Sequence, residues 1–539
     1  MTGVTAIANI LRSEGTEYLF CFPYHPLIDP ATVAGIRPIL GRMERTVINM
    51  ADGYTRLSNG RRIGVCCMQY GPGTENAFPG VAQAYADNVP ILCLPGGAAR
   101  SRQGSPPTFE AVPNYRGVTK WAATINAPER IPEMMRRAFT YLRLGRPGPV
   151  VVEIPDDVAK ATVGDIRYTP VKPVRTAADP QDINEAARLL LNAKSPVLHV
   201  GQGVLFADAC EELRALAERL QIPVMTTLPG KSAFPENHPL ALGSGGYAGT
   251  KMVQHFLDKA DVVFGIGCSF TRTVFATPIP DGKVLIHATC DERDINKDYD
   301  VALALLGDAK LVLQQLLQAT SHAQRPPSNV AEEIKAVKAE WLAEWMPRLT
   351  SDEVPINPYR VVWELTNTVD KTRTIVTHDA GNPRDQMVPF FESHVPHGYL
   401  GWGKSTHLGA SLGLAMGAKL AAPEKLVINV MGDGALGMCG MDLETAARER
   451  IPILTIVLNN GALGGYEKYM PVATEKYRLK YLSGNYTQVA EGLGVVAERV
   501  EKPQDIRPAL RRATAVVQSG RPALLEVITR EDATFSKYW

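Results

Sequence analysis

The chain has 539 residues, a formal net charge of +1 and eight cysteines. It is longer than the roughly 250–300 residues at which a single core stops growing, so we expect about three domains. The near-zero charge, without basic blocks, argues against a nucleic-acid or anionic-membrane binder. The cysteines lie mostly in apolar runs without a CxxC pair, so we expect them to be reduced core residues of a cytoplasmic protein.

The N-terminal stretch MTGVTAIANILRSEG has neither the basic start nor the long apolar run of a signal peptide. No apolar run in the sequence approaches the roughly 20 residues of a membrane span. From there on, short apolar runs rich in β-branched residues alternate with longer helical patterns, which indicates parallel sheets with crossover helices. The sequence therefore predicts an α/β protein with no membrane segment.

Two polar, proline-bearing stretches interrupt this alternation, at residues 166–183 and 319–333, and both are typical of linkers. They divide the chain into an N-terminal unit over residues 1–165, a central unit over 184–318 and a C-terminal unit over 335–539. Each unit has room for one doubly wound parallel sheet.

In the N-terminal unit, Glu44 begins the helical pattern ERTVINMADGYTR, and on its own it is an ordinary acidic residue of a first helical turn. In the central unit, PVLHVGQGVLF reads as a strand, a glycine turn and a helix. Neither pattern by itself identifies a function.

The C-terminal unit carries the most specific pattern. The buried-strand run KLVINVM is followed by GDG, with Asp433 at its centre, and the next strand, IPILTIVL, is followed by Asn459 and Asn460. Because neighbouring parallel strands present their carboxyl ends at one sheet edge, we expect Asp433 and Asn460 to meet there. Carboxylate and amide oxygens suit Mg²⁺, and glycines admit phosphate, so the pattern predicts a clamp for a metal diphosphate.

The GDG, its 24 intervening residues and NN resemble the thiamine-diphosphate motif of thiamine-dependent enzymes. Residues 39–92 resemble the pyrimidine-binding domain of the acetolactate synthase, pyruvate oxidase and benzoylformate decarboxylase branch, and the whole chain is most similar to acetolactate synthase-like proteins. The resemblance implies three doubly wound domains: pyrimidine-binding (1–165), central Rossmann-like (184–318) and diphosphate- and Mg²⁺-binding (335–539). It also implies a homodimer or homotetramer.

The resemblance assigns cofactor roles in the C-terminal unit. Asp433, Asn460 and the carbonyl of Ala462 would bind Mg²⁺, the Thr406 carbonyl would accept from the pyrimidine amine, and Leu408, 25 positions before Asp433, would bend the cofactor into a V shape. The remaining expected thiamine diphosphate contacts are Gly381, Asn382, Gly432, Gly434, Ala435 and Leu463.

Three residues of the N-terminal unit are the expected catalytic groups. By the resemblance, Glu44 would hydrogen-bond the aminopyrimidine ring and favour its imino tautomer. His25 stands on a loop where the synthases have a small residue, and it would transfer protons near its usual pKa of about 6.5, orient substrate or merely shape the pocket. Gln69 matches a catalytic histidine of benzoylformate decarboxylase, but an amide can orient a substrate without delivering a proton.

The reaction implied is the decarboxylation of a 2-oxo acid followed by transfer of the carbanion to a carbonyl acceptor, as in acetolactate synthase. Simple 2-oxo acid decarboxylation and 2-hydroxyacyl-CoA or oxalyl-CoA lysis of an acyl substrate remain alternatives, and a non-catalytic nucleotide-binding protein is a further one. Central domains of relatives hold FAD, ADP or nothing, and the segment GCSFTRTVF, less charged than its flavin-binding counterparts, argues against a flavin.

Overall fold

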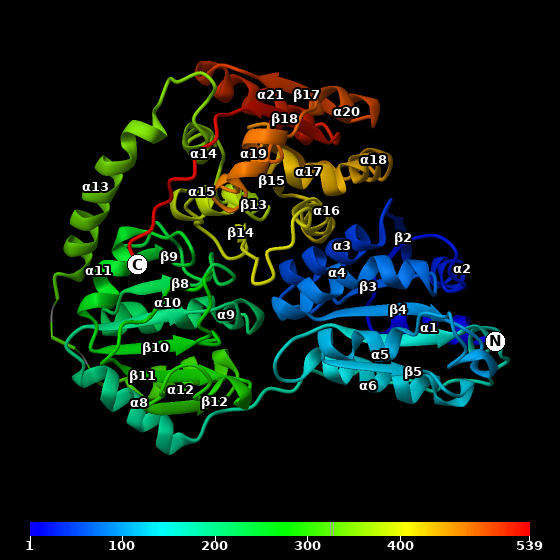
Figure 1. Cartoon of the computed structure of the whole chain (residues 1–539). Helices are drawn as coiled ribbons and strands as arrows, with labels where there is room; N and C mark the ends of the chain where they lie inside the picture. The colour runs from blue at the N-terminus through cyan, green and yellow to red at the C-terminus, as the bar shows by residue number, and fades with distance from the viewer. Residues whose placement is uncertain (324, 327) are drawn as a thin grey trace.

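Three six-stranded sheets organise the computed structural model, which describes residues 1–323, 325–326 and 328–539 (Figure 1). Every strand pair in the three sheets is parallel, and helices cover both faces of each sheet. The prediction of three doubly wound parallel sheets is confirmed.

The first sheet belongs to the N-terminal unit. Its strands are β1 (Tyr18–Cys21), β2 (Arg37–Leu40), β3 (Gly64–Met68), β4 (Ile91–Gly97), β5 (Trp121–Thr124) and β6 (Val150–Pro155), in the spatial order β2-β1-β3-β4-β6-β5. Strands β3 and β6 are buried along their whole length, as expected where helices cover both faces. The helices are α1 (Gly3–Ser13), α2 (Ile28–Val33), α3 (Glu44–Leu57), α4 (Pro72–Ala86), α5 (Ala111–Tyr115), α6 (Ile131–Arg143) and α7 (Asp156–Lys160).

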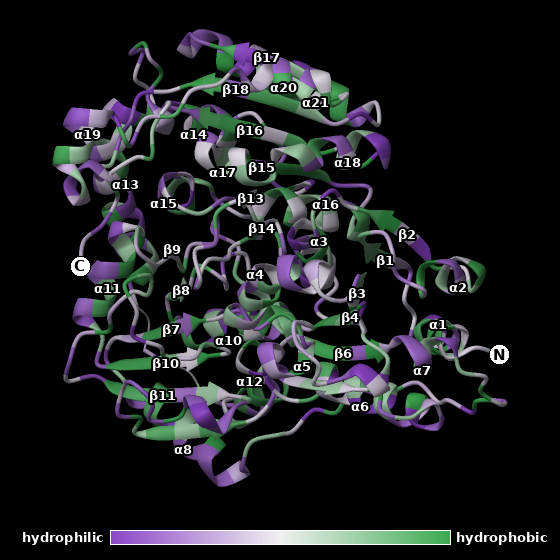
Figure 2. Cartoon of the chain, turned by 45° about the vertical axis from the view of Figure 1, so that its right-hand side comes forward, coloured by the Kyte–Doolittle hydropathy of each residue, from purple (hydrophilic) through white to green (hydrophobic). Residues whose placement is uncertain are grey.

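The central unit contains the second sheet. Its strands are β7 (Pro196–Val200), β8 (Val224–Thr226), β9 (Ala241–Ser244), β10 (Val262–Ile266), β11 (Val284–Thr289) and β12 (Leu303–Leu306), in the order β12-β11-β10-β7-β8-β9. The helices are α8 (Pro180–Asn192), α9 (Gly203–Phe206), α10 (Cys210–Leu220), α11 (Lys251–Lys259) and α12 (Ala309–Ala319). Figure 2 shows hydrophobic residues along β10 and β11 and hydrophilic ones on the outer helix α8.

The third sheet belongs to the C-terminal unit. Its strands are β13 (Thr374–His378), β14 (Tyr399–Leu400), β15 (Leu426–Gly432), β16 (Leu454–Asn459), β17 (Val496–Val500) and β18 (Ala523–Ile528), in the order β14-β13-β15-β16-β18-β17. The helices are α13 (Val330–Leu349), α14 (Pro358–Thr366), α15 (Asn382–Phe390), α16 (Ser411–Ala421), α17 (Asp433–Cys439), α18 (Leu443–Arg448), α19 (Pro471–Tyr477), α20 (Tyr486–Gly492) and α21 (Ile506–Gln518).

The two expected linkers differ in the structure. The stretch 166–183 contains no helix or strand until α8 begins at Pro180. The stretch 319–333 is interrupted by α13, which begins at Val330 and runs along the outside of the molecule from the central to the C-terminal domain (Figure 1). Trp341 of α13 is buried and stacks on Phe390 with ring centroids 4.9 Å apart, so this helix belongs to the core of the C-terminal domain.

The first and third domains meet through α3 and α16. A Cβ atom on Gly53 would lie 2.1 Å from the carbonyl oxygen of Leu414, and one on Gly417 would lie 2.0 Å from that of Met50. These distances are below any real Cβ contact, so the glycines are required for the two backbones to touch. The helix that begins with Glu44 is thereby fixed against the helix that follows Leu408.

Two expectations from composition can be compared with the structure. Among the described residues, none of the helices has the length and apolarity needed to cross a bilayer. All eight cysteines are free thiols, and six of them are buried, as expected for core residues; Cys210 is half-buried and Cys290 is exposed, so these two were wrongly placed in the core.

Candidate active site

The carboxyl ends of β15 and β16 form the floor of a cavity in the C-terminal domain. Asp433 directly follows β15 and is the first residue of α17, and Asn460 directly follows β16. The two strands pair with Gly432 opposite Leu458, so the polar residues after them emerge side by side. Both line the same cavity, of about 260 Å³.

The cavity collects the whole predicted set of C-terminal residues. It is lined by Gly381, Asn382, Thr406, Leu408, Gly432, Asp433, Gly434, Ala435, Asn460, Ala462 and Leu463. Sequence reasoning missed other lining residues, among them Phe275 of the central domain, Arg384, Gln386, Gly464, Tyr466 and Arg530. Phe275 ends the segment GCSFTRTVF, and Arg384 and Gln386 follow the predicted contact Asn382 by two and four positions, but none of the three was assigned a role in this cavity from the sequence.

The electrostatics of Asp433 fit a bound cation. Its side chain is buried, its Oδ2 atom has no hydrogen-bond partner among the described residues, and burial raises its pKa to about 6 despite backbone donors. The described part of the chain has no group of three or more His, Cys, Asp or Glu side chains arranged to hold a metal ion, so the donors available here are a carboxylate, an amide and a carbonyl. Such hard oxygen donors suit Mg²⁺ with water and phosphate.

A buried carboxylate fixes the loop that carries Asn460. Glu526 is fully buried and accepts hydrogen bonds from Asn459 Nδ2 (2.7 Å) and Thr487 Oγ1 (2.7 Å). Asn459 Oδ1 in turn accepts from the backbone N–H of Gly461 (3.1 Å). Burial opposes ionisation of Glu526, but these hydrogen bonds lower its pKa overall, so a charged Glu526 holds Asn459 and the turn after it in place.

A second buried carboxylate joins two walls of the cavity. Asp379, fully buried, accepts hydrogen bonds from the N–H groups of Ala380 (2.8 Å), Gly409 (2.9 Å) and Ser411 (3.0 Å) and from Ser411 Oγ (2.5 Å). The segment that carries Gly381 and Asn382 is therefore tied to the segment that carries Leu408.

In the N-terminal domain, Glu44 and Gln69 lie together at the carboxyl edge of the first sheet. A Cβ on Gly73 would be 3.2 Å from both Glu44 Oε1 and Gln69 Cβ, so these two side chains are neighbours. Glu44 is buried and accepts from Asn76 Nδ2 (3.3 Å). Burial raises the pKa of Glu44, against the effect of its own backbone N–H and of Asn76, which makes it a carboxyl group able to exchange a proton.

His25 stands on the loop after β1, beside Gly96 at the end of β4. Its side chain is buried, its Nδ1 accepts from the Leu27 N–H (3.2 Å), and its Nε2 has no partner among the described residues. Burial lowers the pKa of His25 to about 4. The expectation that it titrates near 6.5 was therefore wrong: without a nearby carboxylate, the buried ring stays neutral at pH 7.

Within one chain, Glu44 and Asp433 do not line the same cavity. Among the described residues, none before Phe275 lines the C-terminal cavity. The Glu44 carboxylate faces Asn76 and the Gly73 backbone in its own domain, while its neighbour Arg45 donates to the Met438 carbonyl (2.7 Å) of α17. Glu44 therefore does not line the cavity that holds Asp433.

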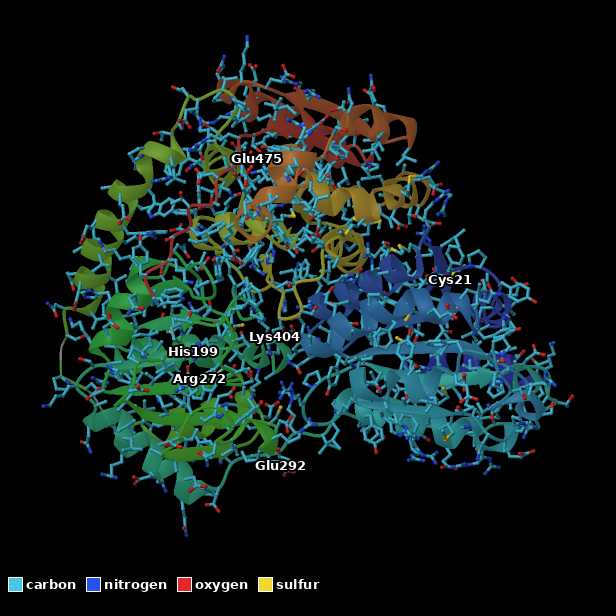
Figure 3. The ribbon with its side chains drawn as sticks, viewed as in Figure 1. Cys21, His199, Arg272, Glu292, Lys404 and Glu475 are labelled. Carbon is cyan, nitrogen blue, oxygen red and sulfur yellow. The ribbon has the colours of Figure 1, made fainter. Side chains whose placement is uncertain are left out.

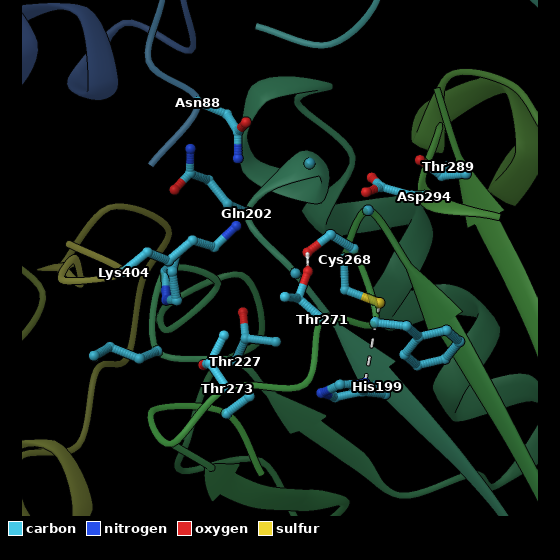
Figure 4. Close-up of a pocket in the computed structure, with 18 of the residues that line it drawn as sticks. Asn88, His199, Gln202, Thr227, Cys268, Thr271, Thr273, Thr289, Asp294 and Lys404 are labelled. Carbon is cyan, nitrogen blue, oxygen red and sulfur yellow. Dashed lines mark hydrogen bonds between the residues drawn. The ribbon is translucent and has the colours of Figure 1, made fainter. Parts of the chain in front are cut away.

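A separate cavity of about 190 Å³ opens in the central domain (Figure 4). His199, Gln202 and Cys268 line it, and Lys404 reaches it from the C-terminal domain (Figures 3 and 4). A Cβ on Gly201 would lie 2.3 Å from the Gly267 carbonyl oxygen, so the glycine turn is required for packing whether or not a nucleotide binds.

Comparison with known families gives three matches along the chain. The descriptions are "Thiamine pyrophosphate enzyme, N-terminal TPP binding domain" over residues 1–122, "central domain" over 183–316 and "C-terminal TPP binding domain" over 379–527.

Curated relatives are similar over nearly their whole length. A probable acetolactate synthase large subunit of Methanocaldococcus jannaschii is 34% identical over 98% of this chain and 92% of the relative. The acetolactate synthase large subunit of Corynebacterium glutamicum is 34% identical over 99% of this chain and 87% of its own length. The acetolactate synthase isozyme 3 large subunit of Escherichia coli is 29% identical over 98% and 94%.

Proposed function

Because this chain belongs to the thiamine pyrophosphate enzymes and is acetolactate synthase-like, we propose that it joins a decarboxylated 2-oxo acid to a carbonyl acceptor, using thiamine diphosphate and Mg²⁺. The observation that carries the proposal is the buried Asp433 carboxylate, whose Oδ2 has no hydrogen-bond partner among the described residues, in a cavity lined by all eleven expected cofactor residues.

The C-terminal residues would hold the cofactor. Asp433, Asn460 and the Ala462 carbonyl would bind Mg²⁺, and the charge of the metal would offset the buried carboxylate. Gly381 and Asn382, at the N-terminus of α15, would meet the diphosphate, because free backbone N–H groups there favour an anion. When bound, thiamine diphosphate supplies the electron sink that allows a 2-oxo acid to lose CO₂.

The N-terminal residues would handle protons and substrate. Glu44, whose pKa burial raises, would exchange a proton with the aminopyrimidine nitrogen. His25, neutral at pH 7, would orient substrate through its unpartnered Nε2 rather than deliver a charge-linked proton. Gln69, beside Glu44, would hydrogen-bond a carbonyl or carboxylate.

The working unit would be a homodimer or an assembly of dimers. Glu44 does not line its own chain's cavity and accepts a hydrogen bond from Asn76 of its own domain, so a partner copy would supply the glutamate. The free cysteines favour a reducing, cytoplasmic compartment.

The metal clamp is tested by calorimetry on Asp433→Ala. The affinity for thiamine diphosphate with Mg²⁺ should fall by more than about 100-fold, since even residues that only support metal ligands contribute about 10–100-fold. Asp370→Ala, which removes an exposed aspartate of the same domain, is the control. Unchanged affinity in Asp433→Ala, or equal wild-type affinity in a chelator, would contradict the assignment.

Product analysis by mass distinguishes the remaining reactions. A screen with 2-oxo acids, aldehydes and acyl-CoA compounds should give a carboligation product retaining the acceptor. Aldehyde alone would indicate a simple decarboxylase, and release of free CoA thioester would indicate a lyase. The absorbance spectrum and the nucleotides released by heating decide whether the central cavity holds FAD, ADP or neither.

A further inference from the structure

Arg384 is a buried cation with an unused donor. It lies on α15, only 4% exposed, and lines the cofactor cavity. Its Nε and Nη2 donate to the two carboxylate oxygens of Asp385 (2.8 and 2.9 Å), while Nη1 has no hydrogen-bond partner among the described residues. A buried guanidinium N–H without a partner is costly, so this edge is suited to an anionic ligand.

The surroundings of Arg384 hold that edge in position. The guanidinium carbon lies 4.7 Å from the ring centroid of Phe275, and a Cβ on Gly403 would lie 3.5 Å from Nη1. Phe275, which also lines the central cavity, comes from the central domain. The other guanidinium of the cavity, Arg530, is already ion-paired with Glu353 and Asp532. Arg384 is therefore the more available anion receptor of the two.

The geometry separates Arg384 from the diphosphate end of the cavity. Asn382 packs against Gly464, where a Cβ would lie 2.4 Å from Asn382 Nδ2 and 3.7 Å from Asn460 Nδ2. Residues two apart on a helix do not face the same way, and Arg384 accordingly contacts Phe275 and Gly403 instead. The neighbours of Arg384 are therefore different from those of Asn382, the residue expected at the diphosphate.

We propose that Arg384 determines acceptor specificity: its free Nη1 binds the carboxylate of a 2-oxo acid acceptor, an inference that rests on the proposed function. In that reaction the donor loses CO₂, a new bond forms to the carbonyl carbon of the acceptor, and the acceptor carbonyl oxygen takes up one proton. The donor carboxylate is lost as CO₂, so a guanidinium bound to it would stabilise the substrate more than the transition state and would slow the reaction. The acceptor keeps its carboxylate in the product, so the hydrogen bond from Arg384 can stabilise it at every stage of the reaction.

The test replaces the ion pair as a unit. Arg384→Gln combined with Asp385→Asn removes both charges, so neither partner is left buried and unpaired. Arg360→Gln, another ion-paired arginine of the same domain that does not line the cavity, is the control. Calorimetry then measures oxamate, a stable carboxylate analogue of a 2-oxo acid, and oxamide, its neutral counterpart, on protein loaded with thiamine diphosphate and Mg²⁺.

The double variant should bind oxamate about 10- to 100-fold more weakly, since a charge-assisted hydrogen bond is lost, with cofactor and oxamide affinities within about twofold of wild type. In turnover assays, the double variant should use a 2-oxo acid acceptor much less efficiently than wild type does, while still using an aldehyde acceptor. Unchanged oxamate affinity, or an equal loss for both acceptors, would overturn the proposal.

Two other outcomes identify what failed. Weaker cofactor binding in the double variant would show that Arg384 serves the diphosphate, which overturns the acceptor role and leaves the proposed function standing. A wild-type protein that binds no thiamine diphosphate would overturn the proposed function, and the acceptor role with it. Arg384→Lys keeps the positive charge but lacks the planar guanidinium group, so it should bind oxamate more tightly than the double variant and more weakly than wild type.

Discussion

Subunit complementation gives the sharpest prediction about how the site is assembled. Glu44→Gln damages the N-terminal group and Asp433→Ala damages the C-terminal cavity, so each variant alone should be inactive. Within one chain, the Glu44 carboxylate accepts from Asn76, and among the described residues none of the N-terminal domain lines the cavity of Asp433. Glu44 and Asp433 of one active centre should therefore come from different chains.

The expected recovery follows from this arrangement. If equal amounts of the two variants exchange subunits freely, about half of the dimers are hybrids, and each hybrid has one site with both lesions and one site with neither. The mixture should therefore regain about one quarter of the wild-type activity per chain. If Glu44 served the cavity of its own chain, every site would carry one lesion and no activity would return.

The assay mixes the purified variants, dissociates and reassociates them, and follows product formation on an accepted 2-oxo acid. Hybrid formation is verified by mass spectrometry with two affinity tags. Proven hybrids without activity would refute the shared site. A double variant carrying both lesions in one chain, mixed with wild type, is the reciprocal control: each hybrid should then have one lesion in each of its two sites and be inactive, whereas sites built within single chains would leave one intact site per hybrid.

Two further predictions concern single residues of the N-terminal domain. Glu44→Gln should bind thiamine diphosphate normally but turn over at least about 10²-fold more slowly, because the amide cannot exchange a proton; exchange of the thiazolium proton at the wild-type rate would count against it. Because burial lowers the pKa of His25 to about 4, the neutral ring stabilises the fold fully above about pH 6.5, and this contribution, on the order of 3 kcal/mol, is lost as the pH falls towards 4. His25→Gln should flatten the fall of the thermal midpoint between pH 6.5 and 5 and leave the rate profile near pH 6.5 unchanged, whereas a new step there would contradict a neutral His25.

The predictable part of the fold and site is local in sequence. Apolar runs and helical patterns define the three sheets, because burial on both faces leaves a clear signature in each strand. Asp433 and Asn460 could be placed together because neighbouring parallel strands present their carboxyl ends at one edge. The turn 201–203 was equally visible, although its glycines are explained by packing against Gly267.

The remainder depends on contacts between distant segments. Asp379 binds Ser411, which is 32 positions away, and nothing in either segment alone indicates the pair. Phe275 enters the cavity from another domain, and only there does it cover Arg384. The neutral state of His25 could not be predicted either, because the shift of its pKa depends on burial by the folded loop and not on neighbouring charges.

The glycine contact between α3 and α16 has a consequence for motion. The backbones of α3 and α16 are in contact at Gly53 and Gly417. A hinge or sliding motion between the first and third domains would therefore make the two helices collide. These domains should move as one rigid body. Substrate entry must then depend on other segments, and the stretch after Asn460 is suited to this, since Tyr466 and Tyr469 are 50% and 74% exposed. Hydrogen exchange should find slow amides in α3 and α16 and fast ones around those tyrosines.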